Sequence, residues 1–141
     1  LKRAVGANFG LGGHQAIENR SYIAQGDAAG QPLNGNQALV LRFAVDEMPP
    51  CNAFWSLTAY GTDLYLVANE IDRWSISDRT PELRYAPDGS LTITLSAKRP
   101  TETANWLPVP NGPYLLGLRV YEGQDAVVDC TWFPPALIPQ S

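Results

Sequence analysis

Short runs of alternating apolar and polar residues recur along the chain from Ser21 onward. The clearest run lies at 91–96, where Leu91, Ile93 and Leu95 alternate with hydroxyl side chains. A period of two points successive side chains to opposite faces of a β-strand, so one face of this segment is buried. Comparable patterns predict strands at 22–24, 38–45, 53–60, 114–121 and 126–132, with a short apolar run at 64–67.

Turn-forming residues separate these runs. Asn34-Gly35 and Asp88-Gly89 are typical of tight turns, and proline pairs at 49–50 and 134–135 end the runs before them. A polar segment at 69–78 and a proline-rich segment at 105–112 are expected to be loops. The only plausible helix lies within residues 1–20, where four glycines make it short or broken.

Six or seven short strands joined by turns predict an all-β fold, an antiparallel jelly-roll-like β-sandwich with a short N-terminal helical segment. A chain of 141 residues is about the size of one domain. We therefore expect a partly helical lead-in at 1–20 and a single β-sandwich domain at 21–141.

Composition and charge exclude several classes of protein. Hydrophobic residues make up 45% of the chain, which excludes a disordered segment, and 12 Gly with 12 Pro favour short elements and many turns. A formal net charge of −4 without a basic run argues against nucleic acid and anionic membranes as partners. No apolar stretch is long enough to span a membrane.

The cysteine and histidine content argues against a transition-metal site. Cys51 and Cys130 are the only cysteines and His14 is the only histidine, and their spacing matches no zinc motif. We predict no cofactor and no metal, although calcium held by Asp and carbonyl oxygens stays open. Two cysteines permit one disulfide bridge and do not require it, so their pairing also stays open.

Several residues in the loops and late strands have side chains suited to ligand contact. A tryptophan next to an amide or guanidinium group in a polar loop is suited to stacking on a sugar ring, and an arginine is suited to clamping a carboxylate. The candidates are Arg73, Trp74, Asn105, Trp106, Arg119 and Tyr121. Each also has a structural alternative, because loop tryptophans cap sandwiches and arginines pair with internal carboxylates such as Asp72 and Asp129.

No catalytic constellation is evident in the sequence. Ser56 lacks the Gly-x-Ser-x-Gly context of a nucleophile elbow, and no spacing singles out an acid and base pair. An enzyme acting on a polymer is the alternative function, of the polysaccharide lyase or hydrolase type. It would use Tyr60 or Tyr121 with Arg119 and an acidic residue on one sheet face.

A series of motifs from about Ser21 to Pro135 resembles the family called domain of unknown function 1214. The motifs are Gly30-Gln31-Pro32-Leu33-Asn34-Gly35, Pro49-Pro50, Phe54-Trp55-Ser56-Leu57-Thr58, Asp72-Arg73-Trp74-Ser75-Ile76, Asp88-Gly89-Ser90-Leu91-Thr92, Asn105-Trp106-Leu107-Pro108 and Trp132-Phe133-Pro134-Pro135. Three positions depart from the family: Trp74 replaces a usual Tyr, Cys51 a small apolar residue, and Cys130 a frequent Gly. If position 74 touches a ligand, specificity here is expected to differ.

The resemblance implies a jelly-roll-like sandwich in bacterial proteins, usually as the C-terminal partner of a second domain of unknown function, numbered 1254. Some relatives carry the domain alone behind a signal or membrane anchor, which implies a periplasmic or otherwise extracytoplasmic location. We therefore expect an accessory or ligand-binding domain. Its partner is expected to be a sugar or small molecule, a second β-sandwich domain, or another copy of itself.

Overall fold

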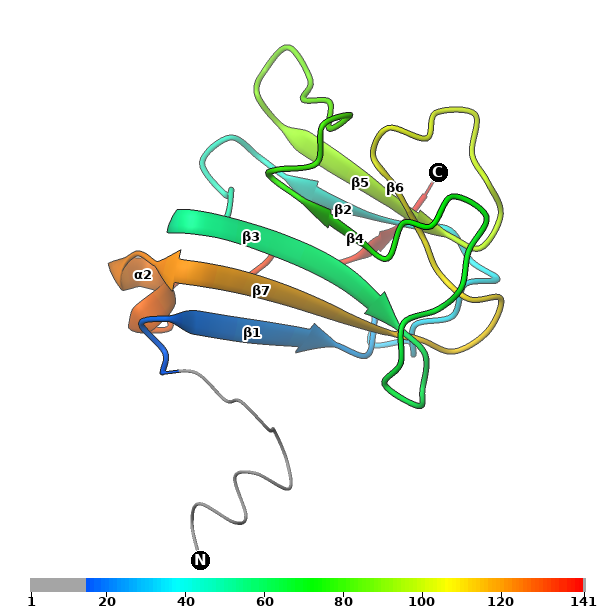
Figure 1. Cartoon of the computed structure of the whole chain (residues 1–141), viewed down its shortest axis with the longest axis horizontal. Helices are drawn as coiled ribbons and strands as arrows, with labels where there is room; N and C mark the ends of the chain where they lie inside the picture. Colours follow the sequence, from blue (N-terminus) through cyan, green and yellow to red (C-terminus); the bar gives the residue numbers. More distant parts are fainter. Residues whose placement is uncertain (1–14, 141) are drawn as a thin grey trace, which may run out of the picture.

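A computed structural model describes residues 15–140 of the chain. Within this range the protein forms eight β-strands and one short helix (Figure 1). In chain order these are β1 (Asn19–Ala24), β2 (Leu39–Phe43), β3 (Cys51–Tyr60), β4 (Ser75–Ser77), β5 (Leu91–Ser96), β6 (Trp106–Pro108), β7 (Leu115–Gly123), α2 (Asp125–Val128) and β8 (Ile138–Pro139). The all-β class predicted from the alternating pattern is confirmed.

The strands form two four-stranded sheets. One sheet has the order β1-β7-β3-β4 and is antiparallel throughout, and the other has the order β6-β5-β2-β8. In the second sheet β5 and β6 run parallel, unlike the wholly antiparallel arrangement that was expected. Near the start of β3, two residues oppose one residue of β7, which forms a β-bulge between Cys51 and Phe54.

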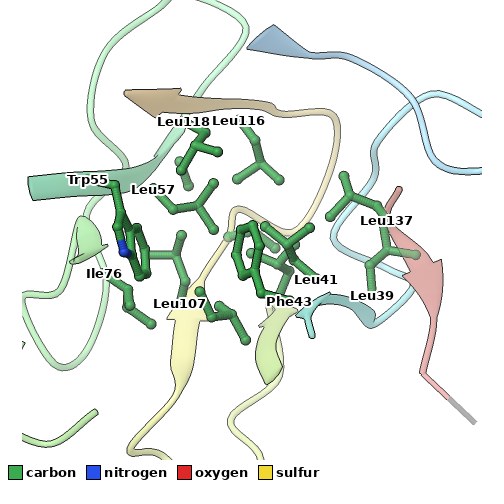
Figure 2. Packing of buried hydrophobic residues seen from close by; sticks show 14 of the residues in the cluster. Leu39, Leu41, Phe43, Trp55, Leu57, Ile76, Leu107, Leu116, Leu118 and Leu137 are labelled. Atoms are coloured by element: carbon green, nitrogen blue, oxygen red, sulfur yellow. The ribbon is translucent and has the colours of Figure 1, made fainter. Parts of the chain in front are cut away.

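The inward faces of the two sheets make the core. Trp55 and Leu57 of β3 and Leu116, Leu118 and Val120 of β7 are buried on one side. The opposite side is formed by alternate residues of β2 and β5, namely Leu39, Leu41, Phe43, Leu91, Ile93 and Leu95. Figure 2 shows members of both sets facing one another across the sandwich, together with Leu137 from the C-terminal segment.

The two lateral edges of the sandwich are closed by different contacts. On one edge, Arg73 just before β4 donates a hydrogen bond to the carbonyl of Trp106 in β6, 3.0 Å away. On the other edge, the Tyr22 hydroxyl in β1 donates to the carbonyl of Trp132, 3.2 Å away. The amide of Ala28 donates to the carbonyl of Leu137, just before β8.

The prediction of a strand at 126–132 is wrong. Residues 125–128 form helix α2, and the chain then runs without a named strand until β8. The consecutive valines Val127 and Val128 favoured a strand, but only Val127 is buried, where it packs against β7. A single turn of helix is enough to bury one side chain, so the local β preference is overridden by this tertiary contact.

Other short elements also differ from the expectation. Both β4 and β6 lie in segments expected to be loops, while the apolar run 64–67 is a loop whose Leu64, Tyr65 and Leu66 are exposed. The helical lead-in expected at 1–20 falls mostly outside the described residues. Within them, residues 15–18 form a turn and β1 begins at Asn19.

The structure of residues 15–140 answers whether the two cysteines are paired, which the sequence left open. Cys51 in β3 and Cys130 after α2 are both free thiols. None of the described helices has the length and hydropathy needed to cross a bilayer.

Candidate functional site

Arg73 lies between the two sheets and holds them together. Its Nη1 atom donates to three carbonyls of the segment leading into β6: Thr103 at 2.6 Å, Ala104 at 3.1 Å and Trp106 at 3.0 Å. Its other terminal nitrogen, Nη2, lies 3.5 Å from a carboxylate oxygen of Glu82. These contacts occupy the guanidinium group, so Arg73 has a structural role at this edge.

Asn105 and Trp106 are likewise engaged in internal contacts. The side-chain oxygen of Asn105 accepts a hydrogen bond from the backbone amide of Arg84. Its side-chain nitrogen donates to the carbonyls of Arg84 and Thr92, so the side chain bonds backbone groups as a neighbouring strand would. The Trp106 side chain is 1% exposed, and its indole Nε1 donates to the carbonyl of Ser96 at 3.0 Å. Trp106 therefore packs in the interior and has no exposed ring to offer a ligand.

Trp74, unlike Asn105 and Trp106, has an exposed side chain. The residue is 40% exposed. Its backbone carbonyl accepts a hydrogen bond from the amide of Ala59 in β3. The four loop candidates thus lie at the edge where β4 and β6 meet, and within that group only Trp74 presents an exposed ring.

The remaining candidates, Arg119 and Tyr121, lie on the outer face of the first sheet. Both belong to β7, where the intervening Val120 points into the core. The Arg119 guanidinium donates to the Tyr60 hydroxyl over 2.8 Å and lies 5.4 Å from the centre of the Tyr60 ring. Tyr60, Arg119 and Tyr121 of the enzyme alternative thus share one sheet face, and Arg119 contacts Tyr60.

Two further residues extend this surface. The rings of Phe54 and Tyr121 are stacked, with centroids 4.2 Å apart and an interplanar angle of 15°. The Arg79 guanidinium covers the Phe54 ring at 4.2 Å. We call the surface formed by Phe54, Tyr60, Arg79, Arg119 and Tyr121 the arginine–aromatic face.

Hydroxyl side chains lie between the two aromatic groups of this face. Ser21 of β1 and Ser56 of β3 are the partners of Arg119 on either side, and Ser77 of β4 is the partner of Ser56. Since side chains of directly paired residues lie on the same face, these serines flank Arg119 in one row across the sheet. The row offers hydrogen-bond donors and acceptors next to a cation.

The electrostatic environment of the face favours an anion. Among residues 15–140, neither Arg119 nor Arg79 has a carboxylate within ion-pairing distance, whereas Arg42, Arg73, Arg84 and Arg99 each have one. In the same part of the chain, no cluster of three or more His, Cys, Asp or Glu residues is suited to a metal ion. Arg79 and Arg119 are thus two guanidinium groups on this face that no carboxylate of the described residues neutralises.

Phe54 and Arg79 were missed as site residues by the sequence reasoning. Phe54, Ser56, Thr58 and Tyr60 alternate along one face of the predicted strand 53–60, which signalled a second, partly polar face. Nothing in the sequence indicates that Arg79, in the loop after β4, reaches back over Phe54.

Solved structures similar to this chain include those of two bacterial proteins. The VPA0106 protein from Vibrio parahaemolyticus is 31% identical with a TM-score of 0.85, over 99% of this chain and 35% of that chain. An uncharacterised protein from Burkholderia cenocepacia is 19% identical with a TM-score of 0.57, over 99% of this chain and 33% of that chain. The chain thus spans about a third of each of these structures, and the second likeness concerns the fold alone.

The sequence comparisons give one family and no curated relative. No curated protein matches the chain. Residues 18–125 match a family described as protein of unknown function, DUF1214, which covers every strand from β1 to β7. The chain therefore belongs to the DUF1214 family.

Proposed function

We propose that the protein is an accessory β-sandwich domain that binds a carboxylate-bearing ligand, such as an acidic sugar, on its arginine–aromatic face. The observation behind this proposal is Arg119, a cation in a row of serine hydroxyls with no carboxylate partner among residues 15–140. A planar guanidinium group binds a carboxylate through two parallel hydrogen bonds. The Tyr60 ring, which lies beside the Arg119 guanidinium, suits the apolar face of a sugar ring.

The enzyme alternative has weaker support from the same surface. It requires an acidic residue beside Tyr60 or Tyr121 and Arg119, and the described residues place no carboxylate in a hydrogen bond or ion pair with any of these three. Binding needs no such group. We therefore favour binding over catalysis for this face.

The experiment is titration calorimetry of the protein with galacturonate oligomers, the matching neutral galactose oligomers, and citrate. Saturable binding of the carboxylate-bearing probes, and not of the neutral oligomers, is expected. Arg119→Gln should weaken this binding by about tenfold or more, since a hydrogen bond to a charged group contributes about 1.5 kcal/mol or more. Arg42→Gln is the matched control, because Arg42 lies on the outer face of the other sheet and is already paired with Asp88.

Two outcomes would contradict the proposal. One is the absence of saturable binding to both carboxylate-bearing probes, and the other is equal weakening by the Arg42 and Arg119 variants. Trp74→Ala is a separate variant in the same series, because its exposed ring lies at a different edge of the molecule. Loss of binding with Trp74→Ala alone would move the site to the edge between β4 and β6.

An extracytoplasmic location and a second domain in the same protein also belong to this proposal. The support for them is the family resemblance and the fact that the chain spans about a third of the two solved relatives. Fractionation of the source bacterium, followed by detection with an antibody against this domain, tests both the compartment and the length of the native protein.

A further inference from the structure

The sandwich contains a cavity at the edge where β1 and β8 lie. Its volume is about 300 Å³, which is at the lower end of the range for ligand pockets in proteins. The inner wall is formed by leucines of the two sheets, namely Leu41, Leu57, Leu116 and Leu118. The outer wall is formed by β1 on one side and by residues 133–137, here called the strap, on the other.

The strap is held at both ends and stands apart from β1 in its middle. Trp132, just before it, accepts a hydrogen bond from the Tyr22 hydroxyl, and its last residue, Leu137, accepts one from the amide of Ala28. Between these anchors lie Pro134 and Pro135, which have no N–H group to donate to the free edge of β1. The prolines therefore prevent the strap from pairing with β1 as a fifth strand, and the cavity lies between the two.

The lining chemistry indicates which kind of molecule the cavity suits. Apart from Tyr22 and Asp27, every lining residue is apolar or glycine. The Tyr22 hydroxyl is bonded to Trp132, and Asp27 Oδ1 already accepts hydrogen bonds from the amides of Ala29 and Gln31. Ordered water needs two to four polar partners, so this cavity is a poor site for water and a good one for hydrocarbon.

The Asp27 carboxylate also restricts the charge of an occupant. It is the one acidic group in the lining, and the lining contains no basic residue. An anionic headgroup at this wall would therefore meet a like charge without a compensating cation. Engineered apolar cavities of about 150 Å³ bind benzene, so a cavity of twice that volume suits a larger uncharged molecule.

We propose that the cavity between β1 and the strap is a second binding site, which takes an uncharged apolar molecule such as a medium-length hydrocarbon chain. The site is separate from the arginine–aromatic face, because its walls are the inward leucines and the strap. Phe133 of the strap lies at this edge and is 65% exposed. It extends the apolar lining to the surface, where a ligand would enter.

The test is fluorescence titration with N-phenyl-1-naphthylamine, an uncharged probe that brightens in apolar sites, followed by displacement with 1-octanol, 1-decanol and decanoate. Saturable binding with one probe per chain is expected, with displacement by the alcohols at lower concentrations than by the decanoate anion. Ala24→Leu, which adds bulk from β1 into the cavity, should weaken probe binding by at least about tenfold.

Two further variants keep the test decisive. Ala136→Leu fills the cavity from the strap and replaces Ala24→Leu if that variant does not fold. Ala68→Leu makes the same change in an exposed loop outside the lining, and should bind the probe within about twofold of the original protein. The proposal is overturned if the original protein shows no saturable probe binding, or if both cavity-filling variants bind the probe with the affinity of the original protein. It is also overturned if the probe binds only to associated copies of the chain and not to single copies.

Discussion

Cys130 ends helix α2 in a backbone conformation that glycine normally occupies. Its φ angle is +59°, in the left-handed region. The amide of Thr131 donates to the carbonyl of Ala126, and the amide of Cys130 donates to that of Val127, which is the hydrogen-bond pattern of a Schellman motif. A Cβ atom is unfavourable in this conformation, so Cys130 stores strain where the family resemblance implies a glycine.

Cys130→Gly is expected to stabilise the protein. Removing the Cβ atom relieves the left-handed strain and should raise the free energy of unfolding by about 0.5–1 kcal/mol, measured by urea denaturation. Cys130→Ala is the matched control, because it removes the thiol but keeps Cβ, and it should give no such gain. An equal gain in both variants would show that the thiol, and not the backbone, is responsible.

Asp88 is a surface carboxylate whose charged form is stabilised by its own turn. The hydroxyl and the amide of Ser90 donate to its Oδ1 atom at 2.7 and 3.0 Å, and Arg42 lies 3.5 Å from Oδ2. These hydrogen bonds, followed by the Arg42 charge, hold the pKa of Asp88 below the ordinary value of 3.8. A carboxyl with a lowered pKa stabilises the fold when ionised and loses this effect as the pH falls through that pKa.

Asp88→Asn should therefore destabilise the protein in a pH-dependent way. At pH 7 its Tm should lie below that of the original protein, and the difference should shrink as the pH falls through the lowered pKa of Asp88. Thermal unfolding of the two proteins at a series of pH values from 7 downward is the measurement. Asp46→Asn, at another exposed aspartate, controls for the loss of one negative charge. A difference in Tm that grows toward low pH would contradict the prediction.

At the scale of elements, the parallel strand β6 is held in place by side chains as much as by its own strand pairing. It has only three residues, and Arg73 and Asn105 supply hydrogen bonds to the backbone around it. Arg73 in turn is positioned by Asn69, whose side chain bonds both the amide and the carbonyl of Arg73. The β4–β6 edge is therefore closed by a network that a lysine at position 73 would not reproduce.

Arg73→Lys is expected to lower the free energy of unfolding by about 2–3 kcal/mol. A lysine ammonium group does not reproduce the planar geometry that reaches three carbonyls and Glu82, and it leaves some of these half-buried carbonyls unpaired. Arg99→Lys is the control, since Arg99 makes one exposed ion pair with Glu70, and it should cost less than about 0.5 kcal/mol. Denaturation of both variants in urea gives the comparison, and similar losses would exclude the structural role of Arg73.

Element length determined what the sequence predicted well. Strands β3, β5 and β7 have six to ten residues and a buried alternating face, so the pattern located them. Strands β4 and β6 have three residues each, too few for a period to be visible, and the backbone around β6 is held by the side chains of Arg73 and Asn105. The apolar run 64–67 shows the opposite case, because hydrophobic residues at a loop tip satisfy a strand pattern without being buried.

The candidate site was predictable only in part for a related reason. Trp74 and Trp106 both lie in polar, turn-rich segments, yet one is exposed and the other is fully buried, because burial depends on strands distant in sequence. Arg119 and Tyr121 were expected as candidates from β7. Their grouping with Phe54 and Arg79 depends on the register of β3 against β7, which one sequence does not specify.

At the scale of the whole molecule, the two long lateral edges differ in composition. The β4–β6 edge is joined by charged and amide side chains, while the β1–β8 edge is apolar and contains the cavity. The two proposed binding sites therefore differ in both position and chemistry. Failure of the carboxylate titration would leave the hydrocarbon titration unaffected, and the reverse also holds.

The pairing of β1 with β7 also has a consequence for synthesis on the ribosome. Ser21 of β1 pairs with Arg119, about 100 residues later in the chain, and Leu39 of β2 pairs with Pro139 over a similar separation. At translation rates of about 5–20 residues per second, β1 waits roughly 5–20 s for its partner. During this interval Tyr22 and Ile23 are exposed on an unpaired strand, which is the form of the nascent chain that a chaperone would recognise.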